Sequence, residues 1–276
     1  MNTLNSQALT RIRKMKAHGE KIAVLTSYDA SFTARIEQAG ADVILVGDSL
    51  GGVIHGSTNT LSVTMEDMLY HMKHVASARQ NTLLIGDLPY HSYQTPSLAL
   101  ENSKRLISAG ADMVKLEGAG LGEGSISESI EHIIKNDIPV CGHLGLLPQS
   151  VEELGGYKVQ GREQAAAEIM IADAKHLESI GVDMIVLECI PSELGKTISS
   201  SISIPTIGIG AGIDCDGQVL VLYDLLGITP GKHPKFVKNF LSVASAKPDD
   251  NLIVSAIKTF VDDVKQSKFP TSDQSY

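Results

Sequence analysis

Three similar segments recur along the chain at a nearly constant spacing. Each begins with a glycine, has an aspartate two residues later, and continues as an aliphatic run that ends near an acidic residue. The three glycines are Gly40, Gly110 and Gly181, which lie 70 and 71 residues apart. Half of this spacing is about 35 residues, the length of one strand, one helix and their connections. The repeat therefore predicts consecutive strand–helix units.

The rest of the chain fits the same period. Aliphatic segments typical of strands also occur at residues 22–27, 82–87, 139–143, 205–209 and 218–222. Helical patterns lie between the strands, at residues 64–79, 96–108, 125–136 and 162–179. Eight continuous aliphatic strands alternating with helices predict a closed (β/α)8 TIM barrel. An open doubly wound sheet is the alternative, but its first strand leads into a glycine-rich phosphate loop, which residues 26–29 lack.

The two ends of the chain extend this pattern. Residues 1–19 contain four basic side chains and no acid, as an organellar presequence would, but they lack a clear cleavage signal. We therefore expect an N-terminal helix with Leu9, Ile12 and Met15 on one face. A C-terminal helical extension is predicted over residues 252–264. No linker divides the chain, so residues 1–276 are expected to form one barrel domain.

Composition excludes several classes of function. With 23 basic and 32 acidic side chains the net charge is −9, which disfavours nucleic-acid binding. No apolar run approaches the roughly 18 residues of a membrane span. The three cysteines contain no C-x-x-C pair, so they predict neither a disulfide framework nor a zinc site. A cytoplasmic protein of a reducing compartment is the expectation.

Acidic residues follow four of the expected strands: Asp48, Asp87, Glu117 and Glu188. In a parallel barrel the carboxyl ends of the strands form the catalytic face. Lys115 lies two residues before Glu117, so the two side chains point the same way. Four carboxylates and one ammonium carry a net charge of −3, which a buried site does not tolerate without compensation. Oxygen ligands favour Mg²⁺ as the compensating cation.

Each of these residues also has a structural interpretation. A lone acid at a strand end usually caps a helix or braces a loop, but four acids on one rim repel each other unless a cation lies among them. Asp42, Asp112 and Asp183 lie at the opposite strand ends and are assigned to turns. His143 either faces the site or is a structural histidine. The glycine-rich segment at residues 208–212 is either a phosphate cradle or a tight turn.

Several motifs resemble those of the ketopantoate hydroxymethyltransferase family, in order from Lys21 to Phe240. They are VGDSLG at residues 46–51, DLP at 87–89, VKLEG at 114–118, CGHLGL at 141–146, GGYKVQG at 155–161, LE at 187–188 and IGIGAG at 207–212. The resemblance implies a (β/α)8 barrel that uses Mg²⁺. It implies transfer of a hydroxymethyl group from 5,10-methylenetetrahydrofolate to 3-methyl-2-oxobutanoate, giving 2-dehydropantoate (ketopantoate) for pantothenate and coenzyme A. It also implies a homo-oligomer, commonly a decamer.

Site residues follow from the same resemblance. Asp48, Asp87 and Glu117 would surround the metal, and Glu188 would be the proton acceptor. Contacts to the oxo acid would come from Asp48, Ser49, Asp87 and Lys115. The segment at residues 118–124 is richer in glycine than the corresponding loop of the family, which leaves its conformation open. The folate-binding residues are not identified; Tyr28, Tyr90, Tyr93 and Tyr157 are aromatic candidates.

These roles suggest a mechanism. The oxo acid would chelate Mg²⁺, its C3 proton would become more acidic, and Glu188 would remove it to give a magnesium-stabilised enolate. The enolate would attack the methylene group carried by the folate. Two alternatives stay open: another Mg²⁺-dependent barrel lyase or mutase of 2-oxo acids, and a non-catalytic scaffold whose rim acids are incidental.

Overall fold

The eight expected strands form a closed parallel barrel. The structure, a computed structural model, describes residues 3–119, 126–150, 156, 158–245 and 251–276. The strands pair in chain order, and the eighth pairs with the first. Their bounds are β1 Ile22–Thr26, β2 Val43–Val46, β3 Leu83–Asp87, β4 Met113–Lys115, β5 Val140–Gly145, β6 Met184–Glu188, β7 Thr206–Ile209 and β8 Gly217–Leu220. The prediction of a (β/α)8 barrel is confirmed.

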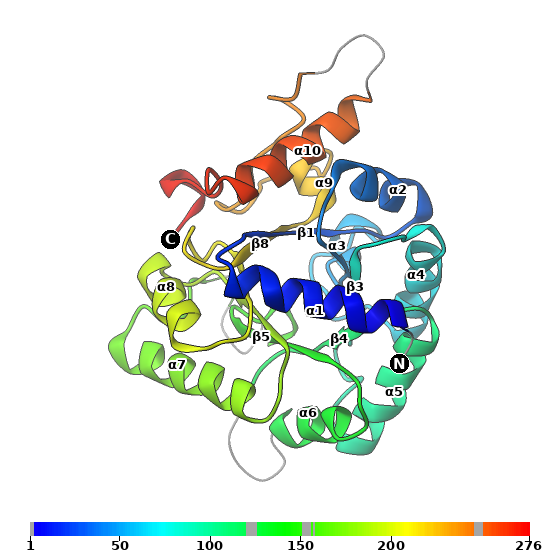
Figure 1. The fold of residues 1–276 in the computed structure, drawn as a ribbon, viewed down its shortest axis with the longest axis vertical. Coiled ribbons are helices and arrows are strands. Elements are labelled where there is room, and N and C mark those ends of the chain that lie inside the picture. The colour runs from blue at the N-terminus through cyan, green and yellow to red at the C-terminus, as the bar shows by residue number, and fades with distance from the viewer. Residues whose placement is uncertain (1–2, 120–125, 151–155, 157, 246–250) are drawn as a thin grey trace.

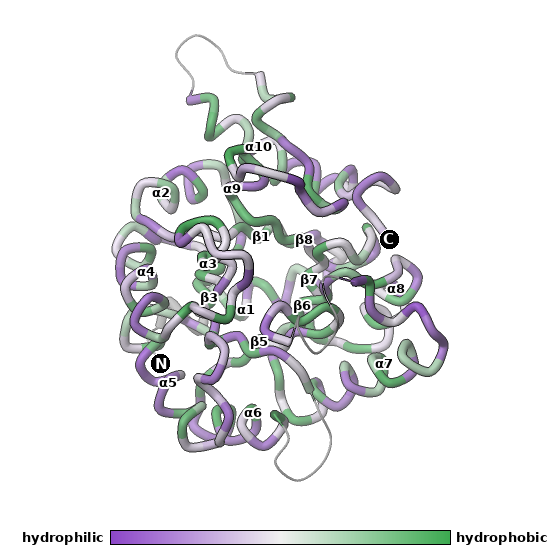
Figure 2. The backbone as a smooth tube through the Cα atoms, turned by 180° about the vertical axis from the view of Figure 1, so that it is seen from behind, coloured by the Kyte–Doolittle hydropathy of each residue, from purple (hydrophilic) through white to green (hydrophobic). Residues whose placement is uncertain are grey.

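Helices surround the barrel, as Figures 1 and 2 show. Their bounds are α1 Thr3–Ala17, α2 Ala30–Ala39, α3 Leu50–Val53, α4 Met65–Ala78, α5 Pro96–Ser108, α6 Ile126–Ile134, α7 Gln164–Ser179, α8 Ser192–Ser201, α9 Leu222–Leu225 and α10 Leu252–Lys265, with short 3₁₀ turns at Pro148–Ser150 and Ser272–Gln274. The expected helices match these to within two residues at each end. Among the described residues no helix is long and apolar enough to cross a membrane.

Local sequence signals explain where several helices begin. Thr64 forms a capping box with Asp67 at the start of α4, and Thr95 caps α5 ahead of Pro96. Both arrangements satisfy backbone N–H groups that lack partners in the first helical turn. The helix predicted near the C-terminus is α10, which packs against α2 and β1.

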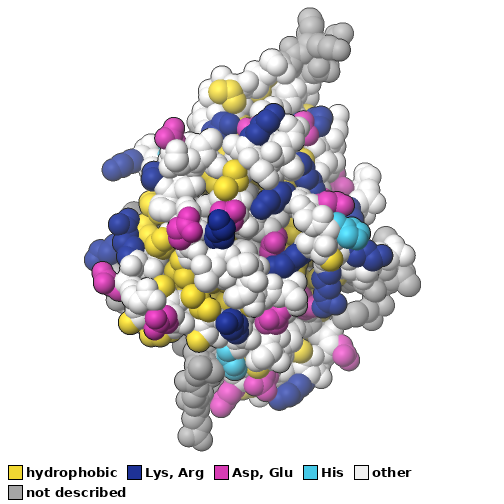
Figure 3. Space-filling model, turned by 60° about the vertical axis from the view of Figure 1, so that its left-hand side comes forward, with side chains coloured by type: hydrophobic (Ala, Val, Ile, Leu, Met, Phe, Trp, Pro, Cys, Tyr) yellow, Lys and Arg dark blue, Asp and Glu magenta, His cyan; other side chains and the backbone are white. Residues whose placement is uncertain are grey.

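The core is aliphatic, in keeping with an aromatic content of 4%. Strand residues such as Ile22, Ile44, Leu83 and Met113 are fully buried. On the face shown in Figure 3, basic and acidic side chains are interspersed rather than gathered into separate patches.

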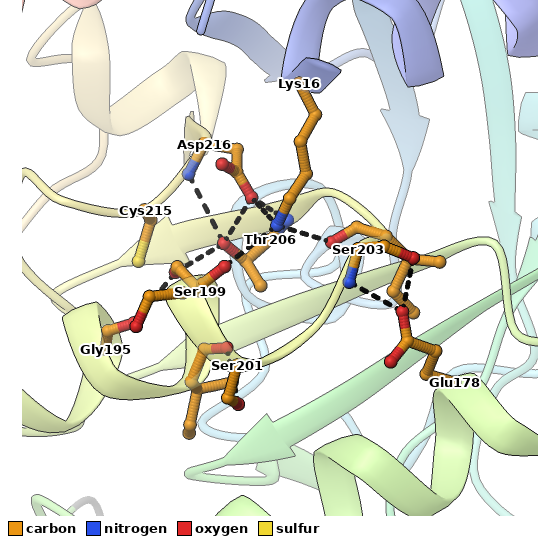
Figure 4. Close-up of polar contacts among 12 residues, drawn as sticks. Lys16, Glu178, Gly195, Ser199, Ser201, Ser203, Thr206, Cys215 and Asp216 are labelled. Carbon is orange, nitrogen blue, oxygen red and sulfur yellow. Dashed lines mark hydrogen bonds and ion pairs between the residues drawn. The ribbon is translucent and has the colours of Figure 1, made fainter.

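Helix α1 crosses the amino-terminal end of the barrel. Ile12 and Met15 are buried there and Leu9 is partly buried, as the sequence predicts. Lys16 connects this helix to α8 and to the segments before β7 and β8, as Figure 4 shows in part. Its Nζ donates to the carbonyl oxygens of Ser199 and Ile204, each at 2.9 Å, and to Asp216 Oδ2 at 2.8 Å. The helix thus closes the end of the barrel opposite the predicted catalytic face.

Four aspartates at this amino-terminal end act in the same way, and we call them the clasp aspartates: Asp42, Asp112, Asp183 and Asp216. Each precedes an even-numbered strand and accepts the backbone N–H at the start of the preceding strand. These N–H donors are Ala23 at 2.9 Å, Leu84 at 2.9 Å, Val140 at 3.1 Å and Thr206 at 2.8 Å. Each also pairs with a cation, respectively Lys265, Arg79, Arg13 and Lys16. The turn role predicted for the first three is confirmed.

Candidate active site

The predicted site residues meet at the carboxyl ends of the strands. Asp48 follows β2, Asp87 ends β3, Lys115 ends β4 and Glu117 lies two residues further on. These four side chains are almost fully buried, between 1% and 6% exposed. Glu188 ends β6, and its side chain is 15% exposed. The barrel therefore places an acidic cluster with one ammonium group where barrel enzymes carry out their chemistry.

Lys115 and Asp87 form the central ion pair of the cluster. They are neighbours in the register between β3 and β4, and Lys115 Nζ lies 2.6 Å from Asp87 Oδ2. Burial lowers the pKa of Lys115, but Asp87, Asp48 and Glu117 outweigh that effect and raise it. The lysine is therefore a fixed cation. If the three acids around it were all ionised, this part of the site would carry a net charge of −2.

Asp48 shows the effect of that excess charge. Burial, and then repulsion from Asp87 and Glu117, raises its pKa to about 8. The backbone N–H of Asp48 also donates to Asp87 Oδ2 at 3.4 Å, which links the ends of β2 and β3. Crowding of buried acids in this way is typical of a site that receives a cation or binds a proton.

Gln149 holds two of these acids. Its Nε2 donates to Asp48 Oδ2 at 2.8 Å and to the Leu88 carbonyl at 3.1 Å, and its backbone N–H donates to Glu117 Oε2 at 3.0 Å. The side chain is buried on the short 3₁₀ turn that follows β5. The sequence analysis missed this residue, because a glutamine in a connecting loop carries no pattern that predicts such contacts.

His143 lies between two acids of the site. Its Nδ1 is 3.3 Å from Glu117 Oε1 and its Nε2 is 3.3 Å from Glu188 Oε2. Burial and Lys115 lower the pKa of His143, but the two glutamates prevail and raise it to about 9. Of the two interpretations of this histidine, the structure supports the one in which it faces the site. Its place in β5, two residues after Cys141 and in line with the barrel interior, was the available signal.

A close backbone approach sets the position of Glu188. Gly145 has φ +96°, and a Cβ atom there would collide with the Glu188 carbonyl oxygen. The Leu146 N–H donates to the same carbonyl at 2.8 Å. A glycine at this point therefore lets the end of β5 fix the backbone that carries the acid.

The site has unused ligand capacity for a metal ion. Asp87 Oδ1 is buried and has no hydrogen-bond partner among the described residues, whereas Glu117 Oε1 lies 3.3 Å from His143 Nδ1. Within those residues, no group of three or more His, Cys, Asp or Glu side chains is arranged to hold a metal ion. Mg²⁺ usually takes one or two protein carboxylates and completes its octahedron with substrate and water. Carboxylate oxygens, of which Asp87 Oδ1 has no hydrogen-bond partner among the described residues, fit such an open site.

The other predicted residues have clear positions. Ser49 Oγ lies 2.7 Å from the hydroxyl of Tyr28, which is buried. Tyr93 donates its hydroxyl to Gln149 Oε1. Tyr90 stacks on His91 with 3.8 Å between ring centroids. Tyr157 and residues 120–124 of the glycine-rich loop lie outside the described residues.

The glycines after β7 are explained by packing. A Cβ atom at Gly210 would lie 2.9 Å from the Tyr276 ring, and one at Gly212 would lie 2.7 Å from Ser192 Cβ. Both residues have positive φ, at +62° and +87°. The tight-turn interpretation of this segment therefore accounts for these glycines without a phosphate.

The fold is shared with enzymes of quite different sequence. A putative phosphonomutase from Burkholderia cenocepacia superposes with a TM-score of 0.64 at 15% identity, over 81% of this chain and 94% of that one. A 2,3-dimethylmalate lyase of the PEP mutase/isocitrate lyase superfamily gives 0.59 at 14% identity, over 80% and 82%. At this level of identity the likeness concerns the barrel alone.

Relatives with similar sequences identify the family of the chain, which the shared fold does not. The 3-methyl-2-oxobutanoate hydroxymethyltransferase of Nitrosococcus oceani is 52% identical over 269 residues, covering 97% of this chain and 98% of its own. The protein of that name from Ruthia magnifica is 53% identical over 273 residues, covering 99% and 100%. The family model for ketopantoate hydroxymethyltransferase matches residues 6–272. The chain therefore belongs to the ketopantoate hydroxymethyltransferase family, whose members are one-carbon transferases.

Proposed function

We propose that the chain transfers a hydroxymethyl group from 5,10-methylenetetrahydrofolate to 3-methyl-2-oxobutanoate and so forms ketopantoate. Relatives that share half of its residues along the whole chain carry the name of this acceptor. The observation that carries the proposal is the buried cluster of Asp48, Asp87 and Glu117 around Lys115. A divalent cation would compensate the negative charge of this cluster, and an anionic 2-oxo acid would bind together with that cation.

We propose that Asp48, Asp87 and Glu117 surround a Mg²⁺ ion. Their oxygens are hard donors, and the buried Asp87 Oδ1, which has no hydrogen-bond partner among the described residues, supports a role in ligation. A bound Mg²⁺ withdraws electron density from the substrate carbonyl and makes the proton on C3 more acidic. Asp48 and Asp87 would also contact the oxo acid.

Lys115 and Ser49 orient the acceptor in this proposal. The ammonium group of Lys115 is buried and fixed by Asp87, so it attracts the substrate carboxylate without having to be ordered first. Ser49 Oγ is held by the Tyr28 hydroxyl, which leaves it available to a second substrate oxygen. Together the two groups would point C3 toward β6.

Glu188 is the proton acceptor in this proposal. Its side chain is the most accessible of the site acids, and His143 Nε2 lies 3.3 Å from its Oε2. Protonated His143 would steady the Glu188 carboxylate before proton transfer. After Glu188 removes the C3 proton, C3 would attack the methylene carbon of the folate. Water would then displace the folate nitrogen from that carbon, which gives the hydroxymethyl group and tetrahydrofolate.

An anaerobic assay with both substrates, with and without EDTA, tests the proposal. We expect ketopantoate and tetrahydrofolate in equal amounts, and loss of turnover in EDTA that Mg²⁺ restores. Turnover of the oxo acid without any folate would instead indicate a magnesium-dependent lyase or mutase. Absence of oxo-acid binding would indicate a non-catalytic barrel.

We further propose that the protein is a cytoplasmic homodecamer, as its resemblance to the family implies. Tyr70 and Ile169 are 62% and 63% exposed in a single chain, and such large apolar groups are suited to contacts between subunits. Light scattering would give a mass near 294 kDa for ten chains of 29.4 kDa. A mass of 29.4 kDa would contradict the assembly.

A further inference from the structure

We infer that Gln149, oriented by Tyr93, is a positioning residue that sets the separation of Asp48 and Glu117 and thereby the affinity of the site for Mg²⁺. The inference rests on the proposed metal role of those acids. Gln149 contacts one acid through its side chain and the other through its backbone, so a single residue fixes two groups that come from different strands.

The carboxamide of Gln149 has a defined orientation. Its Oε1 accepts the hydroxyl of Tyr93, and its Nε2 donates to Asp48 Oδ2 and to the Leu88 carbonyl. A carboxamide turned by 180° would place its oxygen against two acceptors, which is unfavourable. The amino group therefore faces Asp48.

Tyr93 is itself held in the donating orientation. The backbone amide of Glu117 hydrogen-bonds its hydroxyl oxygen, so the hydroxyl hydrogen is directed to Gln149. Burial and the three site acids raise the pKa of Tyr93, which keeps the group protonated. A chain of hydrogen bonds thus runs from Glu117 through Tyr93 and Gln149 to Asp48.

This chain matters because the acids repel one another. Asp48 and Glu117 carry like charge, and Lys115 is bonded to Asp87 rather than to either of them. Without a donor between them, the two carboxylates would move apart or take up protons. Residues that orient metal ligands in this way typically change metal affinity by 10–100-fold when they are replaced.

The test is a calorimetric titration of Mg²⁺ in the presence of 3-methyl-2-oxobutanoate. Gln149→Met keeps the length and volume of the side chain but removes its donor and acceptor. We expect about 10–100-fold weaker Mg²⁺ binding, together with a higher Mg²⁺ concentration for half-maximal turnover. Tyr93→Phe leaves Gln149 in place but frees its carboxamide, and we expect a smaller loss of about three- to tenfold.

A matched control is Gln218→Met. Gln218 is equally buried, and its Nε2 donates to the Gly212 carbonyl at 3.0 Å rather than to a site acid. We expect this variant to lose thermal stability but to bind Mg²⁺ within about twofold of the wild type. If the Gln149 variant does not fold, Tyr93→Phe decides the question alone.

The outcomes distinguish a failure of the proposed function from a failure of the positioning role of Gln149. If wild-type protein does not bind Mg²⁺ with the oxo acid, the proposed function is wrong. If the wild type binds and both Gln149→Met and Tyr93→Phe bind as tightly, the positioning role is wrong and the function stands. Equal losses of Mg²⁺ affinity in Gln149→Met and Gln218→Met would indicate general destabilisation and would likewise overturn the inference.

Discussion

The two ends of the barrel use the same residue types in opposite ways. At the amino-terminal end each clasp aspartate has a cation and a backbone N–H, and all four bind segments of the fold together. At the carboxyl-terminal end three acids surround Lys115, which is paired with Asp87 alone, and Asp87 Oδ1 has no hydrogen-bond partner among the described residues. Acids whose bonds are complete stabilise the fold, whereas acids with unused oxygens are available to a ligand.

The comparison also explains why the repeat is visible in the sequence. Even-numbered strands carry a clasp aspartate at one end, and the first three carry a site acid at the other: Asp48, Glu117 or Glu188. The same short strands thus carry a stabilising aspartate at one end and a candidate site acid at the other, and the two sets of acids are not in contact. Substitutions at the two ends should therefore have separable effects.

Glu188→Gln should have the largest effect. The amide cannot accept the C3 proton, so turnover should fall by about 10²–10⁴-fold, the usual contribution of a general base. Exchange of the C3 proton of 3-methyl-2-oxobutanoate with D₂O, followed by NMR, should stop. Binding of Mg²⁺ and the oxo acid should persist. Exchange at the wild-type rate would show that another group is the base.

Asp87→Ala should weaken two binding events at once. The substitution removes a proposed metal ligand and the partner of Lys115, so affinities for Mg²⁺ and for the oxo acid should both fall by at least about tenfold, or about 1.4 kcal/mol. Calorimetric titrations measure both. Unchanged Mg²⁺ dependence of turnover would contradict the ligand role. Comparison with Asp112→Ala controls for the loss of a buried ion pair as such.

Asp112→Ala should show the reverse pattern. It leaves Arg79 and the Leu84 N–H without their partner, and the free energy of unfolding should fall by about 2–4 kcal/mol. Urea denaturation measures the change. Mg²⁺ affinity should stay within about twofold. On the surface, Asp262→Ala breaks an exposed pair with Lys258 and should cost less than about 0.5 kcal/mol. Weaker Mg²⁺ binding by Asp112→Ala would contradict separate roles for the acids at the two ends of the barrel.

The pH dependence of the metal-free protein should be the mildest effect. His143 has a pKa of about 9 against 6.5 when unfolded, so its stabilisation is complete below pH 6.5 and is lost as the pH rises through 9. Asp48 has a pKa of about 8 against 3.8, so its burial becomes a cost as the pH rises toward 8. Both effects lower the Tm between pH 6.5 and 9 by a few degrees in EDTA.

Thermal unfolding in EDTA and in Mg²⁺ checks this expectation. Mg²⁺ needs ionised ligands, so its stabilising effect should grow with pH over the same interval. His143→Asn should flatten part of the decrease in EDTA. A Tm that rises with pH in EDTA would contradict the assignment of charge in the cluster.

Much of the fold followed from the sequence because barrel strands are continuous aliphatic runs at a fixed period. The clasp role of Asp216 was missed, since Asp214-Cys215-Asp216 lacks the glycine that marks the other three copies. Asp48, Asp87, Lys115 and Glu117 were placed together because strand ends in a parallel barrel meet at one rim.

The sequence did not predict the contacts between these residues. Gln149 and Tyr93 lie in connecting segments, where no periodicity fixes the direction of a side chain. His143 was left undecided because a polar residue in a strand can face the barrel interior or the helices with equal ease. The structure answers that question, because the two ring nitrogens of His143 lie 3.3 Å from Glu117 Oε1 and 3.3 Å from Glu188 Oε2.

Crystallography of the protein with Mg²⁺ and 3-methyl-2-oxobutanoate tests the central claim most directly. The account predicts a Mg²⁺ ion at about 2.0–2.1 Å from oxygens of Asp48 and Asp87, with both substrate oxygens in its octahedron. It also predicts Glu117 beside the ion and Glu188 facing C3. An ion bound elsewhere, with Lys115 and Asp87 still joined and no oxo acid between the acids, would contradict it.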